Sequence, residues 1–130
     1  MVDSVVDATV ICSIFLNEEG CEKLKDRIAE GGNNHAPAFW RFEVANAVWK
    51  RKEITEKVGR ELIHAIWQFP LNSSEPNNWA EDTYSIAKRF GITFYDASYI
   101  AMAKLLKLPL WTLDKRQMDV ARQCRIQIFD

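Results

Sequence analysis

One stretch restricts the fold of this chain more than any other: an acid opens an apolar helix, and a short strand ending in a second acid follows. Asp96 stands near the expected start of the helix, where a carboxylate can cap the first turn and complements the positive end of the macrodipole. Pro109 ends the helix. Asp114 follows the strand at its carboxyl end, where open α/β sheets bind ligands. Taken alone, Asp96 could be a helix cap and Asp114 a loop acid.

The length and composition are those of one globular domain. The 130 residues, 48% hydrophobic and 27% charged, predict a single domain over residues 1–130. No run approaches the ~20 apolar residues of a membrane span, and no signal sequence opens the chain. We therefore expect a cytoplasmic protein without membrane contact. The three cysteines have no C-x-x-C spacing, so neither a disulfide framework nor a zinc site is predicted.

The N-terminus supplies a third acid. Residues 4–7 are a short, mostly β-branched run that ends in Asp7. A buried parallel strand would bring Asp7 to the sheet edge expected for Asp114. Thr9 could then cap the next helix or orient the Asp7 carboxylate by a hydrogen bond. A simple turn acid is the alternative for Asp7.

A predicted amphipathic helix over residues 39–52 supplies a fourth acid. One face has apolar side chains at i, i+3 and i+7, and we expect it in the core: Phe42, Ala45 and Trp49. Glu43, Asn46 and Lys50 form a polar stripe about 100° further round the helix. Such a stripe is ordinarily solvated. Glu43, however, has mostly apolar neighbours in sequence, which is unusual for a free surface acid.

Helices alternating with short strands predict a mainly parallel sheet of four to five strands with helices on both faces. At its carboxyl edge the acids would meet: Asp7, Glu43, Asp96 and Asp114. Like charges raise one another's pKa, so an empty cluster would destabilise the fold. A hard divalent cation with oxygen ligands, Mg²⁺ or Mn²⁺, would compensate. Such an ion also polarises a phosphodiester and lowers the pKa of a bound water.

Four segments resemble the signatures of PIN-domain ribonucleases, and most closely those of the VapC-like toxins of toxin–antitoxin modules. They are VVDAT at 5–9, FEVANA at 42–47, YDASYIAMA at 95–103 and WTLDKR at 111–116. Each segment is weak evidence alone, but all four occur in the expected order over essentially the whole chain. The resemblance implies a three-layer α/β/α fold and an endoribonuclease that cleaves RNA with the help of a metal ion.

The resemblance also implies roles for individual residues. Asp7, Asp96 and Asp114 would bind the metal, and Glu43 would bind it or orient the attacking water. Three polar side chains would support them: Thr9, Asn46 and Thr112. No role follows for the loop Asn72–Asn78.

The toxin resemblance implies protein partners as well: a cognate antitoxin, and a second copy in a homodimer. An antitoxin residue that enters the acidic pocket should be Arg or Lys. The aromatic residues Phe39, Trp40 and Trp49 could form a groove for an amphipathic segment of this partner. The alternative is that all three lie in the core.

Three other functions compete with the nuclease. A haloacid-dehalogenase-like phosphatase or phosphotransferase would need an acid two residues after Asp7, where this chain has Thr9. A receiver-like signalling domain would need paired acids at the end of the first strand and a late lysine after a strand, and neither is evident. A catalytically silent PIN fold that binds RNA or a partner fits the same motifs and stays open.

Overall fold

The computed structural model describes residues 3–75 and 78–129, where four parallel strands form one sheet in the order β3-β2-β1-β4. The strands are β1 (Ser4–Val6), β2 (Asn34–Pro37), β3 (Asn72–Ser74) and β4 (Leu110–Trp111). The helices are α1 (Ala8–Phe15), α2 (Cys21–Ala29), α3 (Trp40–Lys50), α4 (Glu56–Gln68), α5 (Ala80–Phe90), α6 (Phe94–Leu106) and α7 (Lys115–Gln123).

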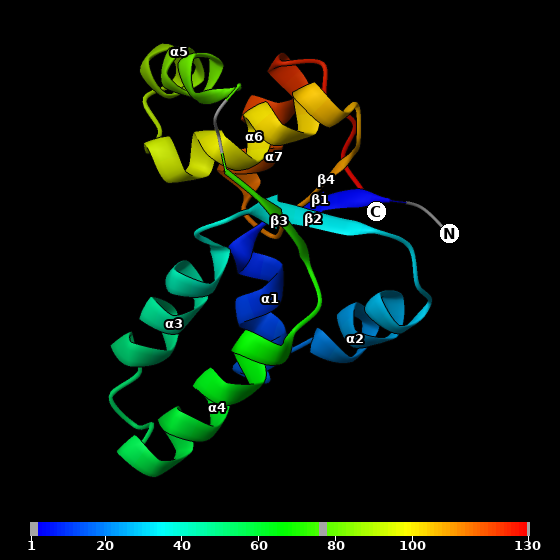
Figure 1. Cartoon of the computed structure of the whole chain (residues 1–130). Coiled ribbons are helices and arrows are strands. Elements are labelled where there is room, and N and C mark those ends of the chain that lie inside the picture. The colour runs from blue at the N-terminus through cyan, green and yellow to red at the C-terminus, as the bar shows by residue number, and fades with distance from the viewer. Residues whose placement is uncertain (1–2, 76–77, 130) are drawn as a thin grey trace.

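The helices lie on both sides of the sheet. Figure 1 shows α5, α6 and α7 on one side and α1 to α4 on the other. Helix α6 packs directly against β1, β2 and β4. The central strand β1 is consequently covered on both faces, which explains its uninterrupted run of buried residues, Ser4, Val5 and Val6. This arrangement confirms the predicted three-layer α/β/α fold with a short parallel sheet.

The core face of α3 differs from the sequence prediction. Trp40, Val44 and Val48 are buried, whereas Phe42 and Trp49 are 70% and 78% exposed. The helix carries two overlapping apolar stripes, and contacts outside the helix select one of them. The Trp40 indole packs edge-on against Phe69 and donates its N–H to Ser73 Oγ at 3.0 Å. Placing Phe42 and Trp49 in the core was therefore wrong.

The sheet edges also differ from expectation. The sequence of residues 68–78 allows at most a short strand near Pro70-Leu71, whereas β3 begins two residues after Pro70, which lacks a backbone N–H. At the opposite edge, the alternating sequence of residues 125–129 predicts a final edge strand. They add a single bridge, between Leu110 and Ile128, beside β4. Part of the unexplained loop Asn72–Asn78 is thus strand β3, and residues 76–77 of that loop lie outside the described part.

Within residues 3–75 and 78–129, no helix is both long enough and apolar enough to cross a membrane.

The rotation of α3 predicts opposite effects for two substitutions on this helix. Val44→Ala removes two buried methyl groups and should lower the free energy of unfolding by roughly 2 kcal/mol. Trp49→Ala removes a much larger but mostly exposed side chain and should change it far less. Urea denaturation of both variants at one protein concentration measures the difference. A greater loss of stability in Trp49→Ala would contradict this assignment of the core face.

Candidate active site

The pairing of β1 with β4 brings the first acid to the last sequence motif. Val6 pairs with Trp111, and the Asp7 N–H donates to the Trp111 carbonyl at 2.8 Å. The chain therefore leaves both strands at the same edge, with Thr112 beside Asp7. Asp114 follows two residues later and caps α7, where its Oδ1 accepts from the backbone N–H groups of Arg116 and Gln117.

Asp7 is the most buried of the four predicted acids, with 3% of its surface exposed. Its Oδ2 accepts hydrogen bonds from the hydroxyls of Thr9 and Thr112, each at 2.7 Å. These threonines are themselves held in place, since Thr9 Oγ1 accepts from the Leu113 N–H and Thr112 Oγ1 from the Asp114 N–H. The two threonines predicted as supporting residues thus both contact the Asp7 carboxylate.

Asp96 lies in the first turn of α6 and is not the helix cap. Thr93 caps this helix, and its hydroxyl accepts from the Asp96 N–H at 3.1 Å. The Asp96 carbonyl oxygen accepts from the buried side chain of Gln117 at 3.0 Å, which ties the start of α6 to α7. The capping role considered for Asp96 belongs to Thr93, so the Asp96 carboxylate is not needed as the cap.

Glu43 reaches the site from the first turn of α3. Its Oε1 accepts a hydrogen bond from the hydroxyl of Tyr99 on α6 at 2.7 Å. Tyr99 is fully buried. Burial is also the main cause that raises the pKa of Glu43 from 4.5 to about 7, with smaller contributions from the negative charges of Asp7 and Asp96.

All four predicted acids line one open hollow of about 380 Å³. Desolvation is the largest cause that raises the pKa of Asp7 and of Asp96, and neighbouring carboxylates raise both further. In the part of the chain that the structure describes, none of the ion pairs involves these four acids. The hollow therefore gathers four acids that have no ion-pair partner among the described residues.

The acids are gathered but not tightly clustered. Among the described residues, no three Asp, Glu, His or Cys side chains form a group ready to hold a metal ion together. Mg²⁺ keeps several of its waters and is usually bound through one or two carboxylates, so it does not require such a group. Zinc would instead require a close tetrahedral set, commonly with sulfur or nitrogen ligands.

Comparison with known proteins places this arrangement in a family. The family model described as PIN domain matches residues 4–123. The chain belongs to the PIN-domain family. This membership confirms the resemblance seen in the four sequence motifs, and each of those motifs carries one of the four acids in the hollow.

Individual relatives agree with the assignment to the PIN domain. Ribonuclease VapC3 of Pyrobaculum aerophilum is 30% identical over 118 residues, which span 86% of this chain and 89% of the relative. The crystal structure of PAE2754 from the same organism superposes with a TM-score of 0.70 at 22% identity, covering 92% of this chain and 79% of the other. A toxin–antitoxin complex from Klebsiella pneumoniae gives 0.64 at 15% identity, covering 88% and 89%. The two structures show the shared fold.

The predicted residues Phe39, Trp40 and Asn46 do not line the acidic hollow of this PIN domain. Asn46 is exposed and lines a neighbouring hollow that shares Glu43 with the acidic one. Trp40 was expected at a partner groove, but it is fully buried and therefore cannot contact a partner there. Phe39 is half-buried and packs edge-on against Tyr95 and Tyr99.

Sequence reasoning missed three residues at the site. Cys12 and Glu18 line the acidic hollow, and burial with nearby carboxylates raises the pKa of the Cys12 thiol to about 11. Tyr99 lay inside a recognised motif without an assigned role. Its position three residues after Asp96 puts both on one side of α6, and this spacing was the available signal.

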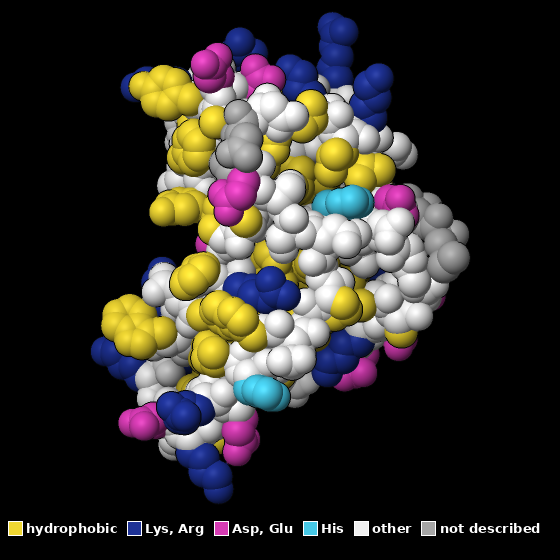
Figure 2. All heavy atoms as spheres, viewed as in Figure 1, with side chains coloured by type: hydrophobic (Ala, Val, Ile, Leu, Met, Phe, Trp, Pro, Cys, Tyr) yellow, Lys and Arg dark blue, Asp and Glu magenta, His cyan; other side chains and the backbone are white. Residues whose placement is uncertain are grey.

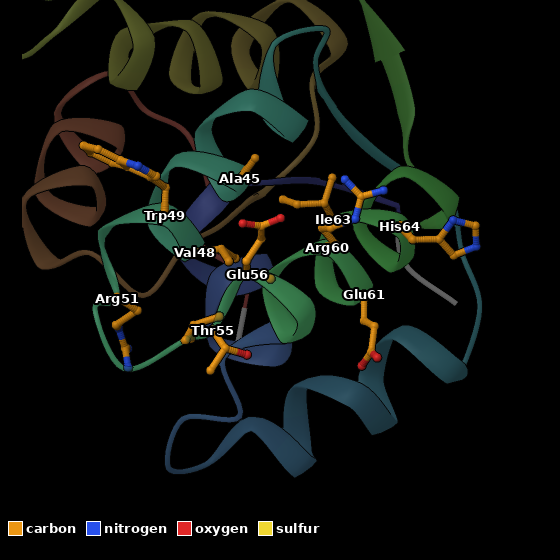
Figure 3. A pocket seen from close by; sticks show the side chains of 12 residues that line it. Ala45, Val48, Trp49, Arg51, Thr55, Glu56, Arg60, Glu61, Ile63 and His64 are labelled. Atoms are coloured by element: carbon orange, nitrogen blue, oxygen red, sulfur yellow. The ribbon is translucent and has the colours of Figure 1, made fainter.

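A larger hollow of about 860 Å³ lies between α3 and α4, where Figure 3 shows Trp49 at one side and Glu56 between the helices. None of the four acids lines this hollow. It is thus a candidate for contact with a partner and not for chemistry at the acids.

The raised pKa of Glu43 predicts a pH dependence of stability in the metal-free protein. Between pH 4.5 and about 7 the folded state holds a proton that the unfolded chain releases. The free energy of unfolding should therefore fall as the pH rises through this window. Glu43→Gln cannot lose a proton and should reduce this fall; Asp7 and Asp96 would maintain part of it.

Urea denaturation in EDTA at about pH 5 and about pH 8 measures this dependence. Glu61→Gln, an exposed acid on α4, is the matched control and should behave like the parent. If the stability of Glu43→Gln depends on pH as that of the parent does, the pKa of Glu43 is not raised by burial.

Proposed function

We propose that this PIN domain is a metal-dependent endoribonuclease and the toxin of a toxin–antitoxin pair. The observation that carries the proposal is the acidic hollow lined by Asp7, Glu43, Asp96 and Asp114, none of which forms an ion pair within the described residues. The relative named Ribonuclease VapC3 supports RNA as the substrate.

The donor set fits a hard divalent cation. Carboxylate oxygens line the hollow, and their mutual repulsion and desolvation are what a bound Mg²⁺ or Mn²⁺ would relieve. Asp7, Asp96 and Asp114 would hold the ion, with Glu43 as a further ligand or as the group that orients water. When bound, such an ion polarises the phosphodiester and lowers the pKa of the attacking water.

The chain's own residues prepare the site before any ligand arrives. Thr9 and Thr112 both donate to Asp7 Oδ2, so this carboxylate keeps one orientation. Both hydroxyls bind Oδ2, so neither of them occupies Oδ1, which could contact a cation. Glu43, with a pKa of about 7, can exchange a proton near neutral pH, which suits a group that accepts one from water.

Substitution of Asp96 tests the proposed chemistry. Asp96→Asn keeps the size of the side chain and removes its charge, while the Thr93 cap remains. We expect the variant to fold like the parent and to lose at least about 100-fold in RNA cleavage with Mg²⁺ or Mn²⁺, in line with losses of electrostatic groups at active sites. Gel analysis of tRNA, rRNA and mRNA substrates, with an EDTA arm, measures cleavage.

Asp82→Asn is the matched control, because Asp82 also lies in the first turn of a helix, α5, but does not line the hollow. Parental cleavage by Asp96→Asn would overturn the site assignment. RNA binding without cleavage by the parent, at any metal concentration, would favour the catalytically silent module instead.

The proposed partners are an antitoxin and a second copy of the chain. Figure 2 shows hydrophobic side chains gathered along one side of the molecule, over α3 and α4 and again over α5 and α6. On α3 and α4 the exposed aromatic residues include Phe42, Trp49 and Trp67. Large exposed apolar patches mark interaction sites, and the Klebsiella complex supports an antitoxin as occupant. The cytoplasmic location stays a prediction.

Trp49 is the residue on which to test the antitoxin. Trp49→Ala should weaken the complex with the protein encoded beside this chain by about 10-fold or more, because exposed tryptophans often dominate interfaces. Co-expression, pull-down and titration of the purified partner measure the effect. Tyr84→Ala, an exposed aromatic on α5, is the control. A complex indifferent to Trp49→Ala would remove the α3–α4 surface from the proposal.

A further inference from the structure

Tyr99 is a buried side chain whose polar atom serves one neighbour. The residue is 0% exposed, and its hydroxyl donates to Glu43 Oε1 at 2.7 Å, joining α6 to α3. No other hydrogen bond of this hydroxyl occurs among the described residues. A phenylalanine would fill the same space without a polar atom to satisfy. The oxygen of Tyr99 is therefore explained by Glu43 and not by packing.

The aromatic ring is fixed by its surroundings. Phe39 packs edge-on against it, with ring centroids 6.0 Å apart at an angle of 89°. Tyr99 lies three residues after Asp96 on α6, so the helix that brings one acid to the hollow also carries the group that holds another. Because ring and helix are both packed, the hydroxyl offers Glu43 a rigid donor.

Glu43 needs such a donor more than the aspartates do. Its side chain has more rotatable bonds and a larger loss of conformational freedom on ordering. Neighbouring carboxylates also repel it, and none of the ion pairs in the described part of the chain holds it. With Oε1 occupied by Tyr99, Oε2 is the oxygen left for a ligand in the hollow.

We propose that Tyr99 is a positioning residue that holds the Glu43 carboxylate by Oε1, so that Oε2 is presented to the metal or to the attacking water. The inference rests on the proposed function, since it assigns Glu43 a ligand. It adds an orienting contact for Glu43 to the two that the threonines provide for Asp7.

The test is a double-mutant cycle with two readouts. Tyr99→Phe removes only the hydroxyl oxygen, and Glu43→Ala removes its acceptor. Mn²⁺ affinity is measured by calorimetry without RNA, and cleavage by single-turnover kinetics at saturating RNA. Loss of an outer contact to a metal ligand typically lowers metal affinity or activity by about 10- to 100-fold, and we expect Tyr99→Phe to fall in this range. RNA affinity should stay at the parental value.

The cycle separates positioning from packing. In the Glu43→Ala background, adding Tyr99→Phe should change neither Mn²⁺ affinity nor rate, because the hydroxyl then has no carboxylate to hold. Tyr95→Phe is the matched control: its ring also packs against Phe39, at 5.0 Å, but the side chain is exposed and does not line the acidic hollow. It should match the parent in both readouts.

Two results would overturn this inference and leave the proposed function standing. The first is a parental Mn²⁺ affinity and cleavage rate in Tyr99→Phe. The second is that Tyr99→Phe causes an equal loss in the parent and in the Glu43→Ala background. If Tyr99→Phe does not fold by circular dichroism, Glu43→Asp replaces it. The carboxylate of Glu43→Asp lies one methylene closer to the backbone and should lose the contact with the Tyr99 hydroxyl, so parental Mn²⁺ affinity in this variant would also overturn the inference. A parent chain that neither binds Mn²⁺ nor cleaves RNA would overturn the proposed function, and this inference with it.

Discussion

The burial of the Asp7 carboxylate is the constraint on which the site depends. A buried charge destabilises a fold unless hydrogen bonds or an opposite charge compensate it. Here the compensation comes from two threonine hydroxyls that share one oxygen, and one of them, Thr112, directly follows β4. The β1–β4 register is therefore both a structural and a chemical requirement, since a slip by one residue would turn Thr112 to the opposite face of the sheet.

The site is held together at the cost of local stability. Desolvation raises the pKa of Asp7, Glu43 and Asp96, and the charges of neighbouring acids, Asp114 among them, raise it further. Because their pKa values are raised, ionising these three carboxyl groups costs more in the folded protein than in the unfolded chain. Sites with this character are expected where function, and not stability, has selected the residues. The packing of α6 against three strands in the surrounding core offsets the stability that these carboxyl groups cost.

The orientation of α3 links the core to the site. Successive residues of a helix are about 100° apart, so a core face centred on Trp40 and Val44 places Glu43 at its border. A face centred on Phe42 and Trp49 would have turned Glu43 differently. The half-buried state of Glu43 and its contact with Tyr99 both follow from the observed rotation. Because the sequence analysis placed Phe42 and Trp49 in the core, it could not explain why Glu43 is half-buried and has a raised pKa.

The sequence by itself determined the parallel α/β/α architecture and the family, and it indicated the four acids that the fold brings to one hollow, because short apolar runs, helix periods and acids at element ends are local signals. It also indicated Thr9 and Thr112, which lie close in sequence to the acids they support. Only the tertiary structure decided which stripe of α3 is buried and that Tyr99 holds Glu43. Both depend on contacts between segments distant in sequence: Ser73 with Trp40, and α6 with α3. A helix with two apolar stripes carries no local information that chooses between them, so its neighbours make the choice.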